Sequence, residues 1–593
     1  MHHAQLVSLR VDLTGKAQFT HILSNAPLKR ALDRAIACCG SYSAPFYASI
    51  GRCLASPIQI ISPFLPFEAS WCSAIGIMKR PISERLQLVS FPEGGGFLPT
   101  PAEGLDPDLR IGDRQKYIAG LNKESSFWPA GCVEASCPHP LLITEKHQET
   151  FEKLAEALDL VIQDIVERWW TDEEAGFPLR MPLEPREEIL LRWIDGNRDI
   201  CRPYSERKGS WRPDFVIEND ETGAENFRIC EINARFCWNG FMLIRGGQKG
   251  LSTFDVESRG LIRATDPDTV SSTLKKNIYS IDKSLTFHQL KIASSLLGLF
   301  DPGQPLHLVK GKEHGYDIYM FMELAKKLGL NLRLIHPDDL RILPDEAGVN
   351  GSKLCCLAST EATESFPSGT GEIVEDVNQI CLELHQSEFR SLGSEMQKQI
   401  SVRCFNDLRT MLLVHDKRML GIIREELGSL KSRGVISIDQ ANRLANGIAH
   451  TVLPGSSTLF ALEQQSHFSE SLKNDYLLKP TRGGKGAGIL FGDEISNSDW
   501  LAILQTMKSP QIHEKQTSYV LQRKVCQPFY DIFLGSDATP SRCHMVGTFH
   551  MVHGKFLGLG IWRCSTGRLC AISTGGASWM VSVMQRPVSG GIL

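Results

Sequence analysis

Residues 477–489 join a lysine-bearing apolar strand to a glycine-rich basic turn, reading Leu-Leu-Lys-Pro-Thr-Arg-Gly-Gly-Lys-Gly-Ala-Gly-Ile. Glycines let backbone N–H groups approach oxygen atoms closely, and Lys and Arg neutralise charge. The pattern predicts a β-hairpin that covers the phosphates of a nucleotide. No Ser or Thr follows Gly484-Lys485, so this is not a Walker A loop, and an ordinary surface turn is the alternative. The candidate contacts are Lys479, Arg482, Gly484, Lys485, Gly486 and Gly488.

A second group of polar residues lies at the ends of two strands predicted between 210 and 235. The period of two along a strand places Glu231 and Asn233 on one face. If the two strands pair as a hairpin, Asp214 approaches both. Two carboxylates and an amide oxygen are hard ligands suited to Mg²⁺, and Arg212 would keep a carboxylate ionised or hold a phosphate. A solvated hairpin with scattered charges is the alternative.

The C-terminal strands supply a third group. The predicted strand 519–525 contains Gln522 and Val525, and its backbone could carry the edge of an adenine base through one N–H and one C=O. Arg563 follows an apolar run, where a guanidinium would stabilise charge developing on a transferred phosphoryl group. Taken alone, Arg563 is more often a surface residue at a strand end.

The elements that must position these residues follow from hydrophobic periodicity. Apolar residues between 151 and 169 recur on one face, which predicts a core-packing helix. A buried strand at 306–309, an amphipathic helix over 317–328 and a strand at 331–335 predict a βαβ unit with parallel strands. Without a GxGxxG motif, a dinucleotide site is not expected there. A further helix is predicted over 405–427. Residues before 140 are rich in turn formers, so short strands and loops are expected rather than long helices.

Composition sets the limits of the whole chain. At 593 residues the chain exceeds one hydrophobic core, so two to four domains are expected. A formal net charge of −4 gives no electrostatic case for nucleic acid or a membrane surface. The first residues show no signal peptide and the apolar stretches are too short to span a bilayer, which predicts a cytoplasmic protein. The seventeen cysteines include no CxxC pair, so packed, reduced thiols are expected rather than structural zinc.

Taken in order, these motifs resemble the ATP-grasp superfamily, in particular its glutathionylspermidine synthase-like branch. The resemblance covers roughly 200–260 and 405–585, and the stretch from Cys230 to Phe241 is also similar to ATP-grasp enzymes of fungal specialised metabolism. The motifs that carry it are Arg212-Pro-Asp214, Glu231-Ile-Asn233, Leu453-Pro454, Leu478-Lys479-Pro480, the Gly483 to Gly488 loop, Gln522, Gly547-Thr-Phe, the run from Gly558 to Arg563, and Thr574-Gly-Gly576.

The resemblance implies an α+β or α/β chain with the ATP-grasp fold, a Rossmann-like βαβ pre-grasp portion and an additional N-terminal region. The expected segments are 1–145, of unassigned role; 146–300, with a helix and the metal-ligand strands; 301–400, the βαβ subdomain; and 401–593, which binds nucleotide. It also implies an ATP-dependent carboxylate–amine ligase working through an acyl phosphate. Its partners would be small-molecule carboxylate and amine substrates in secondary metabolism, with ATP and two Mg²⁺ ions.

Residue roles carried over by the resemblance follow the matching positions. Mg²⁺ would be held by Asp214, Glu231 and Asn233. The phosphates would be contacted by Lys479 and the loop with Lys485, the adenine hinge would lie at Gln522, and the transferring phosphoryl group would be stabilised by Arg212 and Arg563.

One position departs from the family pattern. The family carries a nucleotide-contacting lysine before Leu453-Pro454, and His450 stands at the matching position here. The substitution would weaken ATP binding, make it pH-dependent, or leave the role to another cation. The accompanying amidase domain of some members has no counterpart in the sequence. Two alternatives to the ligase stay open: a catalytically degenerate binding module, and an ATP-dependent phosphotransferase of the same fold.

Overall fold

The chain divides into two compact units, Met1–Lys79 and Arg80–Leu593. The computed structural model describes residues 8–11, 17–20, 85–100, 107–265 and 301–586, the last with gaps at 302, 313, 316, 328, 361, 363, 513–515, 536–538 and 573–575. In the first unit β1 (Ser8–Val11) pairs antiparallel with β2 (Ala17–Thr20). All other described residues belong to the second unit, and the four segments predicted from the sequence stay a prediction.

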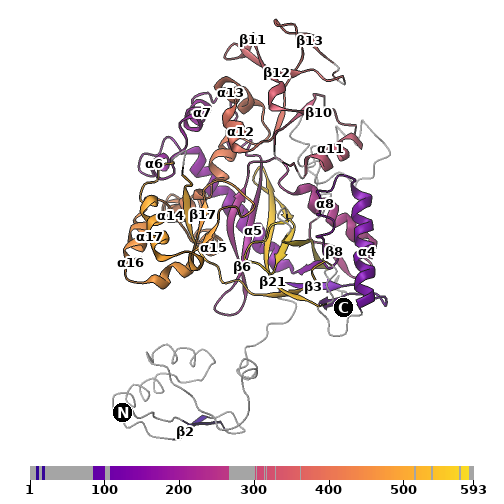
Figure 1. Cartoon of the computed structure of the whole chain (residues 1–593), viewed down its shortest axis with the longest axis vertical. Coiled ribbons are helices and arrows are strands. Elements are labelled where there is room, and N and C mark those ends of the chain that lie inside the picture. Colours follow the sequence, from indigo (N-terminus) through magenta and orange to yellow (C-terminus); the bar gives the residue numbers. More distant parts are fainter. Residues whose placement is uncertain are drawn as a thin grey trace. The chain divides into compact units, whose positions relative to one another are not determined.

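An antiparallel sheet at the centre of the second unit makes neighbours of segments far apart in the sequence (Figure 1). The predicted hairpin is present, and the long strand β21 pairs with the other edge of its first strand, opposing Thr548 to Asp214. The strand order is β24-β23-β21-β6-β7, with β20 and β22 also paired to β21. The strands are β6 (Ser210–Asn219), β7 (Glu225–Asn233), β20 (Tyr530–Ile532), β21 (Ser541–Val552), β22 (Lys555–Leu559), β23 (Trp562–Ser565) and β24 (Ser578–Met580).

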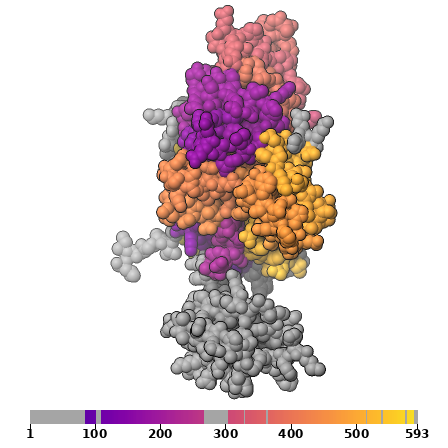
Figure 2. Space-filling view, turned by 90° about the vertical axis from the view of Figure 1, so that its left-hand side faces the viewer, coloured from indigo at the N-terminus to yellow at the C-terminus, as the bar shows by residue number. Residues whose placement is uncertain are grey.

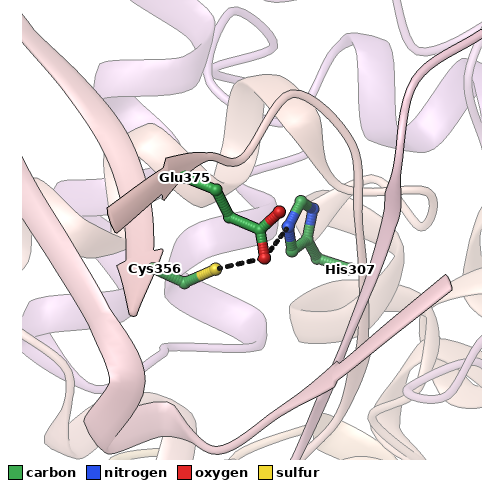
Figure 3. Close-up of side chains that lie close together, drawn as sticks. All are labelled: His307, Cys356 and Glu375. Carbon is green, nitrogen blue, oxygen red and sulfur yellow. Dashed lines mark hydrogen bonds and ion pairs between the residues drawn. The ribbon is translucent and has the colours of Figure 1, made fainter. Parts of the chain in front are cut away.

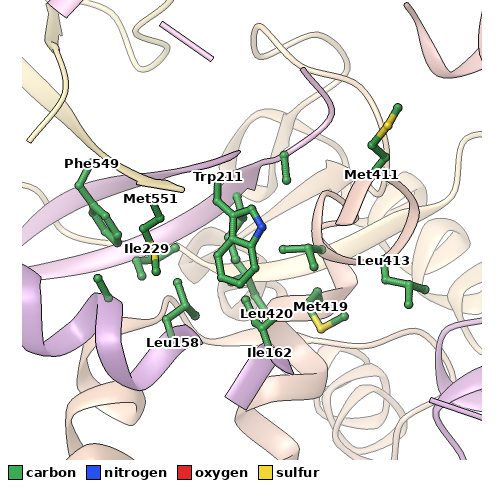
Figure 4. Packing of buried hydrophobic residues seen from close by; sticks show 14 of the residues in the cluster. Leu158, Ile162, Trp211, Ile229, Met411, Leu413, Met419, Leu420, Phe549 and Met551 are labelled. Carbon is green, nitrogen blue, oxygen red and sulfur yellow. The ribbon is translucent and has the colours of Figure 1, made fainter. Parts of the chain in front are cut away.

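The helix predicted over 151–169 is confirmed as α5 (Glu145–Glu167), which packs on this sheet. The ring of Phe151 lies with its centroid 4.5 Å from those of Phe215 and Phe227 on the hairpin. Figure 4 shows Trp211 of β6 reaching toward Ile162 of α5, among side chains from several other elements. The large buried rings therefore fix the hairpin against the helix, and with it the polar residues at the hairpin's end. The helix α15 (Ile438–Gly447) packs beside α5, and α14 is Arg418–Ser432.

A second, four-stranded sheet carries the glycine-rich loop. Its order is β16-β19-β17-β18, and β17 and β18 form the hairpin that the sequence predicts around residues 481–489. Trp500 and Leu459 pack in a separate core on this sheet. The elements are β16 (Thr451–Val452), α16 (Ser457–Ser466), β17 (Tyr476–Pro480), β18 (Leu490–Phe491), α17 (Asn497–Met507) and β19 (Tyr519–Arg523).

The predicted βαβ unit is also confirmed, because β9 and β10 pair in parallel on either side of α11 in the chain. A third parallel strand, β15, completes this small sheet, and an antiparallel sheet of order β11-β12-β14-β13 accompanies it. The elements are β9 (Leu306–Lys310), α11 (Ile318–Lys327), β10 (Leu332–Ile335), β11 (Leu340–Val349), β12 (Ser352–Leu357), β13 (Phe366–Pro367), β14 (Ile373–Asp376) and β15 (Ile380–Glu383).

The remaining elements close the unit around these sheets. In Figure 2 purple surface from about residues 150–200 adjoins orange surface from about 400–450, and the ion pair of Arg180 with Glu425 (2.7 Å) links these segments. A five-stranded sheet has the order β4-β3-β5-β25-β8. The elements are β3 (Gln87–Ser90), β4 (Leu98–Thr100), β5 (Leu141–Ile143), α6 (Phe177–Arg180), α7 (Pro185–Gly196), α8 (Phe241–Gly250), β8 (Leu261–Arg263), α12 (Gln386–Ser391), α13 (Ser394–Arg403) and β25 (Ser582–Gln585).

Three predictions about whole helices and strands are wrong, apart from the end of the strand predicted over 519–525. Residues before 140 include a long helix, α4 (Pro107–Glu124), which has only a weak apolar stripe and is placed by packing against α8. The helix expected over 405–427 is two pieces, the π-helical turn Thr410–Val414 and α14, separated by a charged break. The strand expected over 556–563 is interrupted where the Gly560 N–H bonds to the Thr548 carbonyl (2.8 Å), so it forms β22 and β23.

Two further expectations concern thiols and membranes. Each cysteine that the structure describes carries a free thiol, and most are buried, as the sequence predicts. Within the described ranges, no helix has the length and apolar character needed to cross a bilayer. The Thr574-Gly-Gly576 run lies outside the described residues except for its last glycine.

Candidate active site

The two predicted acidic residues lie directly opposite each other in the hairpin. Asp214 on β6 pairs in register with Glu231 on β7, and a shift of register follows, so that Phe215 faces Ile229. Directly opposed residues share a face of the sheet. Asn233 lies on the same face, with its Nδ2 atom 3.1 Å from Asp214 Oδ1 and 3.3 Å from Glu231 Oε1. The structure therefore brings the three predicted metal-site residues together; their role as ligands stays a prediction.

This donor set fits a hard divalent cation. Two carboxylates converge, and a half-turn of the Asn233 amide would exchange its NH₂ group for a carbonyl oxygen, completing an all-oxygen site of the kind that Mg²⁺ prefers. Asp214 is buried, which fixes its position, whereas Glu231 keeps a side-chain exposure of 24%. The exposed carboxylate is the one that a metal–nucleotide complex can reach from solvent.

Cations surround both carboxylates. Arg212 contacts Asp214 through Nε (2.8 Å) and Nη2 (3.2 Å), and Arg563 binds the same carboxylate. Lys417 lies with its Nζ 3.6 Å from Glu231 Oε2. Burial favours the neutral acid at Glu231, but the positive charge of Lys417 and its neighbours outweighs it and lowers the pKa of Glu231 to about 2. Both predicted catalytic arginines are thus placed at the acidic pair.

Lys479 and Gln522 join the four-stranded sheet of the glycine-rich loop to this hairpin. Lys479 Nζ and Gln522 Nε2 both donate to the carbonyl oxygen of Cys230, at 3.2 and 3.4 Å, where the register of the hairpin shifts. With Lys479, four cations stand near two carboxylates. The excess of positive charge suits a polyphosphate.

Most backbone N–H and C=O groups of β19 are paired with the neighbouring strands of its sheet. Gln522 pairs with Thr451 on one side and Leu477 on the other, and the Lys524 N–H donates to the Asp475 carbonyl (2.7 Å). The strand therefore ends before Val525, which corrects the predicted span of 519–525. Val525 lies just beyond the paired stretch, so an adenine edge would meet the backbone there rather than along the strand.

The glycine-rich loop lies over the acidic pair. Gly483, Gly484 and Lys485 line the same cavity as Glu231 and Asn233. The Gly483 carbonyl accepts a hydrogen bond from Lys417 Nζ (2.8 Å). Gly483 has φ +104°, a conformation that L-residues rarely adopt. Open space surrounds the Cβ position of Gly483 and of Gly484, so no neighbouring atom crowds this part of the loop. Gly486 and Gly488 also adopt positive φ, with Leu569 and Pro480 close by.

Arg482 points elsewhere, since it does not line the cavity. Its guanidinium binds Glu187 through Nη1 (3.1 Å) and Nη2 (2.5 Å), and Nη1 also contacts Glu184 (3.2 Å). Both acids belong to the start of α7. In this arrangement Arg482 anchors the loop, and the geometry gives no support to its predicted contact with phosphate.

His450 occupies the position where the family pattern has lysine. Its carbonyl accepts from the Arg523 N–H (2.8 Å), and burial followed by the charges of nearby arginines lowers the pKa of its imidazole. A neutral imidazole adds no charge near neutral pH, and His450 does not line the cavity. Lys417, directly before α14, is one of the four cations near the acidic pair, and it was not predicted from the sequence.

The cavity has a volume of about 210 Å³ and extends from the loop to a buried acid, Asp317. One Asp317 oxygen accepts from the Gly240 N–H at the start of α8, and Oδ1 has no hydrogen-bond partner among the described residues. Burial raises the pKa of Asp317 to about 6, against the lowering effect of the Gly240 N–H.

Sequence reasoning missed Asp317 because its position in the sequence looks like the ordinary start of a helix. Lys417 could have been found from the sequence, because the polar run His415 to Arg418 interrupts an apolar helical pattern.

Comparison with known proteins shows which family the chain resembles. A family model described as the AnkG N-terminal domain matches residues 154–413. A relative from Aspergillus thermomutatus, named ATP-grasp enzyme ankG, is 34% identical over 484 residues, which are 80% of this chain and 94% of that protein. A solved structure, a glutathione synthetase-like effector (GSS30) from Globodera pallida in its apo form, is 11% identical with a TM-score of 0.46, covering 82% of this chain and 99% of that one.

The chain is therefore a mixed α/β protein of the ATP-grasp class. Within that class it belongs to the family of the ankG enzyme, at 34% identity to its Aspergillus thermomutatus member.

Proposed function

We propose that this chain is an ATP- and Mg²⁺-dependent carboxylate–amine ligase of small-molecule biosynthesis. The observation that carries the proposal is the pairing of Asp214 with Glu231 among four cations near the glycine-rich loop, with the Glu231 carboxylate held ionised and lining the cavity. Family membership supports an ATP-grasp enzyme, and the excess of cations supports a polyphosphate ligand.

The reaction has two steps. A carboxylate oxygen of the first substrate attacks the γ-phosphorus of ATP, forming an acyl phosphate as the bond to ADP breaks. The amine nitrogen of the second substrate then attacks the acyl carbon, the phosphate leaves, and one proton is released with the amide. In phosphoryl transfer, positioning and charge neutralisation supply nearly all of the catalysis.

The cations of this chain supply that neutralisation. Arg212 and Arg563 converge on Asp214, where they would stabilise charge on the transferring phosphoryl group. Lys479 and Lys485 would contact the phosphates from the sheet and from the loop. Asp214, Glu231 and Asn233 would hold Mg²⁺, which when bound neutralises phosphate charge and fixes the position of the oxygens.

Asp317 would receive the amine. It lines the cavity, its Oδ1 makes no hydrogen bond of normal geometry among the described residues, and a pKa of about 6 leaves it largely ionised near neutral pH. A carboxylate in this state can accept a hydrogen bond from an amine and take its proton as the new bond forms.

Trapping the acyl phosphate tests the reaction without knowledge of the amine. The full chain is incubated with ATP, Mg²⁺, pooled carboxylic acids and hydroxylamine, and the hydroxamate, ADP and free phosphate are measured. A ligase gives all three in equal amounts, and Glu231→Gln abolishes them. Glu218→Gln is the matched control, because Glu218 lies on the same hairpin, paired with Arg228 away from the cavity.

The other outcomes identify the rivals. A phosphate ester formed with ADP, without hydroxamate or free phosphate, would replace the ligase with a phosphotransferase of the same fold. Nucleotide binding without turnover over the whole pool would favour a degenerate binding module, for which the neutral His450 is the supporting observation.

A further inference from the structure

A buried group of three potential metal ligands lies in the small subdomain, outside the cavity. His307 of β9, Cys356 of β12 and Glu375 of β14 direct their side chains toward one another (Figure 3). Glu375 Oε1 is 3.9 Å from both Cys356 Sγ and His307 Nε2, and all three ligand atoms lie within 4.8 Å of one another. A tetrahedral ion with bonds of about 2.0–2.3 Å holds its ligand atoms roughly 3.5 Å apart. The cluster needs only a small contraction to reach that spacing.

The histidine gives the second observation. His307 has an exposed fraction of 0%, and neither of its ring nitrogens makes a hydrogen bond of normal geometry among the described residues, although backbone groups of Pro305 and Gln379 lie nearby. An imidazole buried without a partner is costly. A cation at the centre of the cluster would give Nε2 the partner that it lacks.

One neighbour offers a competing explanation. Arg333 of β10 lies with its Nε 3.4 Å from Glu375 Oε1, so the acid could serve only as the partner of a buried arginine. That pairing accounts for Glu375 but not for His307 or for the convergence of Cys356. It is also compatible with a metal, because ligating carboxylates are usually hydrogen-bonded by a second group.

We propose that His307, Cys356 and Glu375 form a structural site for a single zinc-class cation. The N, S and O donors match Zn²⁺, which takes nitrogen, thiolate and carboxylate ligands in a tetrahedral arrangement. On binding, the Cys356 thiol loses its proton to solvent, and the thiolate and the Glu375 carboxylate together balance the two charges of the ion. A water molecule enclosed with the ion as the chain folds supplies the fourth ligand.

The position of the site suggests what the ion does. Cys356 and Glu375 face each other across the antiparallel sheet, whereas His307 lies on the central strand of the parallel sheet. An ion bound to all three residues links the two sheets of the subdomain. Because the site is buried, the ion binds as the chain folds, and the site differs in chemistry from the oxygen-only set proposed for Mg²⁺.

Metal content and cobalt spectroscopy test the site on the full chain, without ATP or substrate. The protein is produced in medium supplemented with Zn²⁺, or with Co²⁺ in its place, and bound metal is measured by elemental analysis. We expect about one equivalent of either metal and, with Co²⁺, a thiolate-to-metal charge-transfer band. Cys356→Ser abolishes the band and lowers bound metal at least about tenfold. Cys355→Ser, its buried neighbour whose thiol bonds to Asp376 instead (3.3 Å), keeps both.

Wild-type protein without stoichiometric metal would overturn the proposal and leave Glu375 as the partner of Arg333. An unchanged cobalt band in Cys356→Ser would overturn it as well. Glu375→Gln is measured alongside with circular dichroism, so that loss of metal in a folded protein is separated from misfolding. Since no readout uses nucleotide, failure of this site and failure of the proposed ligase are distinguishable.

Discussion

Lys417 contacts two parts of the site at once. Its Nζ donates to the Gly483 carbonyl (2.8 Å), lies 3.6 Å from Glu231, and its backbone N–H donates to the Thr481 carbonyl (3.2 Å). A single buried side chain therefore joins the loop to the acidic pair, and its charge is the largest influence opposing protonation of Glu231.

Lys417→Met should weaken ATP binding by roughly 10- to 100-fold, because the Glu231 carboxylate loses its ion-pair partner and the loop loses the hydrogen bond to the Gly483 carbonyl. The pKa of Glu231 should rise from about 2, so between pH 7 and 5 the ATP affinity of the variant should fall more steeply than that of wild type. Calorimetric titration with ATP and Mg²⁺ across this range measures both effects. Lys431→Met, on the exposed side of α14, is the control. Wild-type affinity and a level pH profile in Lys417→Met would contradict the role assigned to this lysine.

Asp317 should make the stability of the protein depend on pH. Its carboxyl has an ordinary pKa of 3.8 and a folded value of about 6, so between these values the folded state holds a proton that the unfolded chain has released. Stability from this group is present below 3.8 and is lost as pH rises through 6. The free energy of unfolding of wild type minus that of Asp317→Asn should fall by on the order of 2–3 kcal/mol over this range.

Urea unfolding of both proteins at pH 4.5 and pH 7 measures this difference. Asp439→Asn, an exposed position in the first turn of α15, controls for general effects of removing an aspartate. A difference that stays constant or rises with pH for Asp317→Asn would show that this carboxyl is not raised by burial.

At the scale of elements, the hairpin β17–β18 is held from one side by α7. Arg482 binds Glu187 and Glu184, so the loop's position depends on a helix nearly three hundred residues earlier in the chain. An ion pair between elements can act as an anchor even where neither residue touches a ligand.

A double-mutant cycle separates the anchor from a phosphate contact. If Arg482 acts only by holding the loop, Arg482→Met and Glu187→Gln should each weaken ATP binding by a few-fold, and the double variant should be no worse than either one. If the guanidinium contacts phosphate, the effect of Arg482→Met should be the larger and should persist in the Glu187→Gln background. ATP affinities of the four proteins, with thermal stability as a check, decide between the two.

The strands of the site could be read from the sequence because their information is local. Period-two alternation placed Glu231 and Asn233 on one face, pairing of the two strands as a hairpin brought Asp214 to them, and the glycines marked the loop. What the sequence did not indicate depends on contacts between distant segments. The carbonyl of Cys230 receives donors from two strands some 250 to 290 residues later, and Arg482 is turned from the cavity by acids of α7.

For the whole molecule, too, the features set by local sequence patterns could be predicted, and the features set by contacts between distant segments could not. The βαβ unit was predictable because each of its elements carries its own apolar pattern. The helix α4 was missed because its pattern is weak and packing against α8 decides its conformation. The His307, Cys356 and Glu375 cluster was missed for a similar reason, since its residues come from separate strands and show no ligand spacing in the sequence.

The most direct measurement is the thermal stability of the full chain with ATP alone, Mg²⁺ alone and both together, on wild type, Glu231→Gln and Glu218→Gln. Saturating ligand should stabilise the fold by about 2.7 kcal/mol at a hundredfold excess over its Kd. We predict a shift that needs both ligands, is lost in Glu231→Gln and is kept in Glu218→Gln. An equal shift in all three proteins, or none in wild type, would contradict a nucleotide–metal site at the Asp214–Glu231 pair.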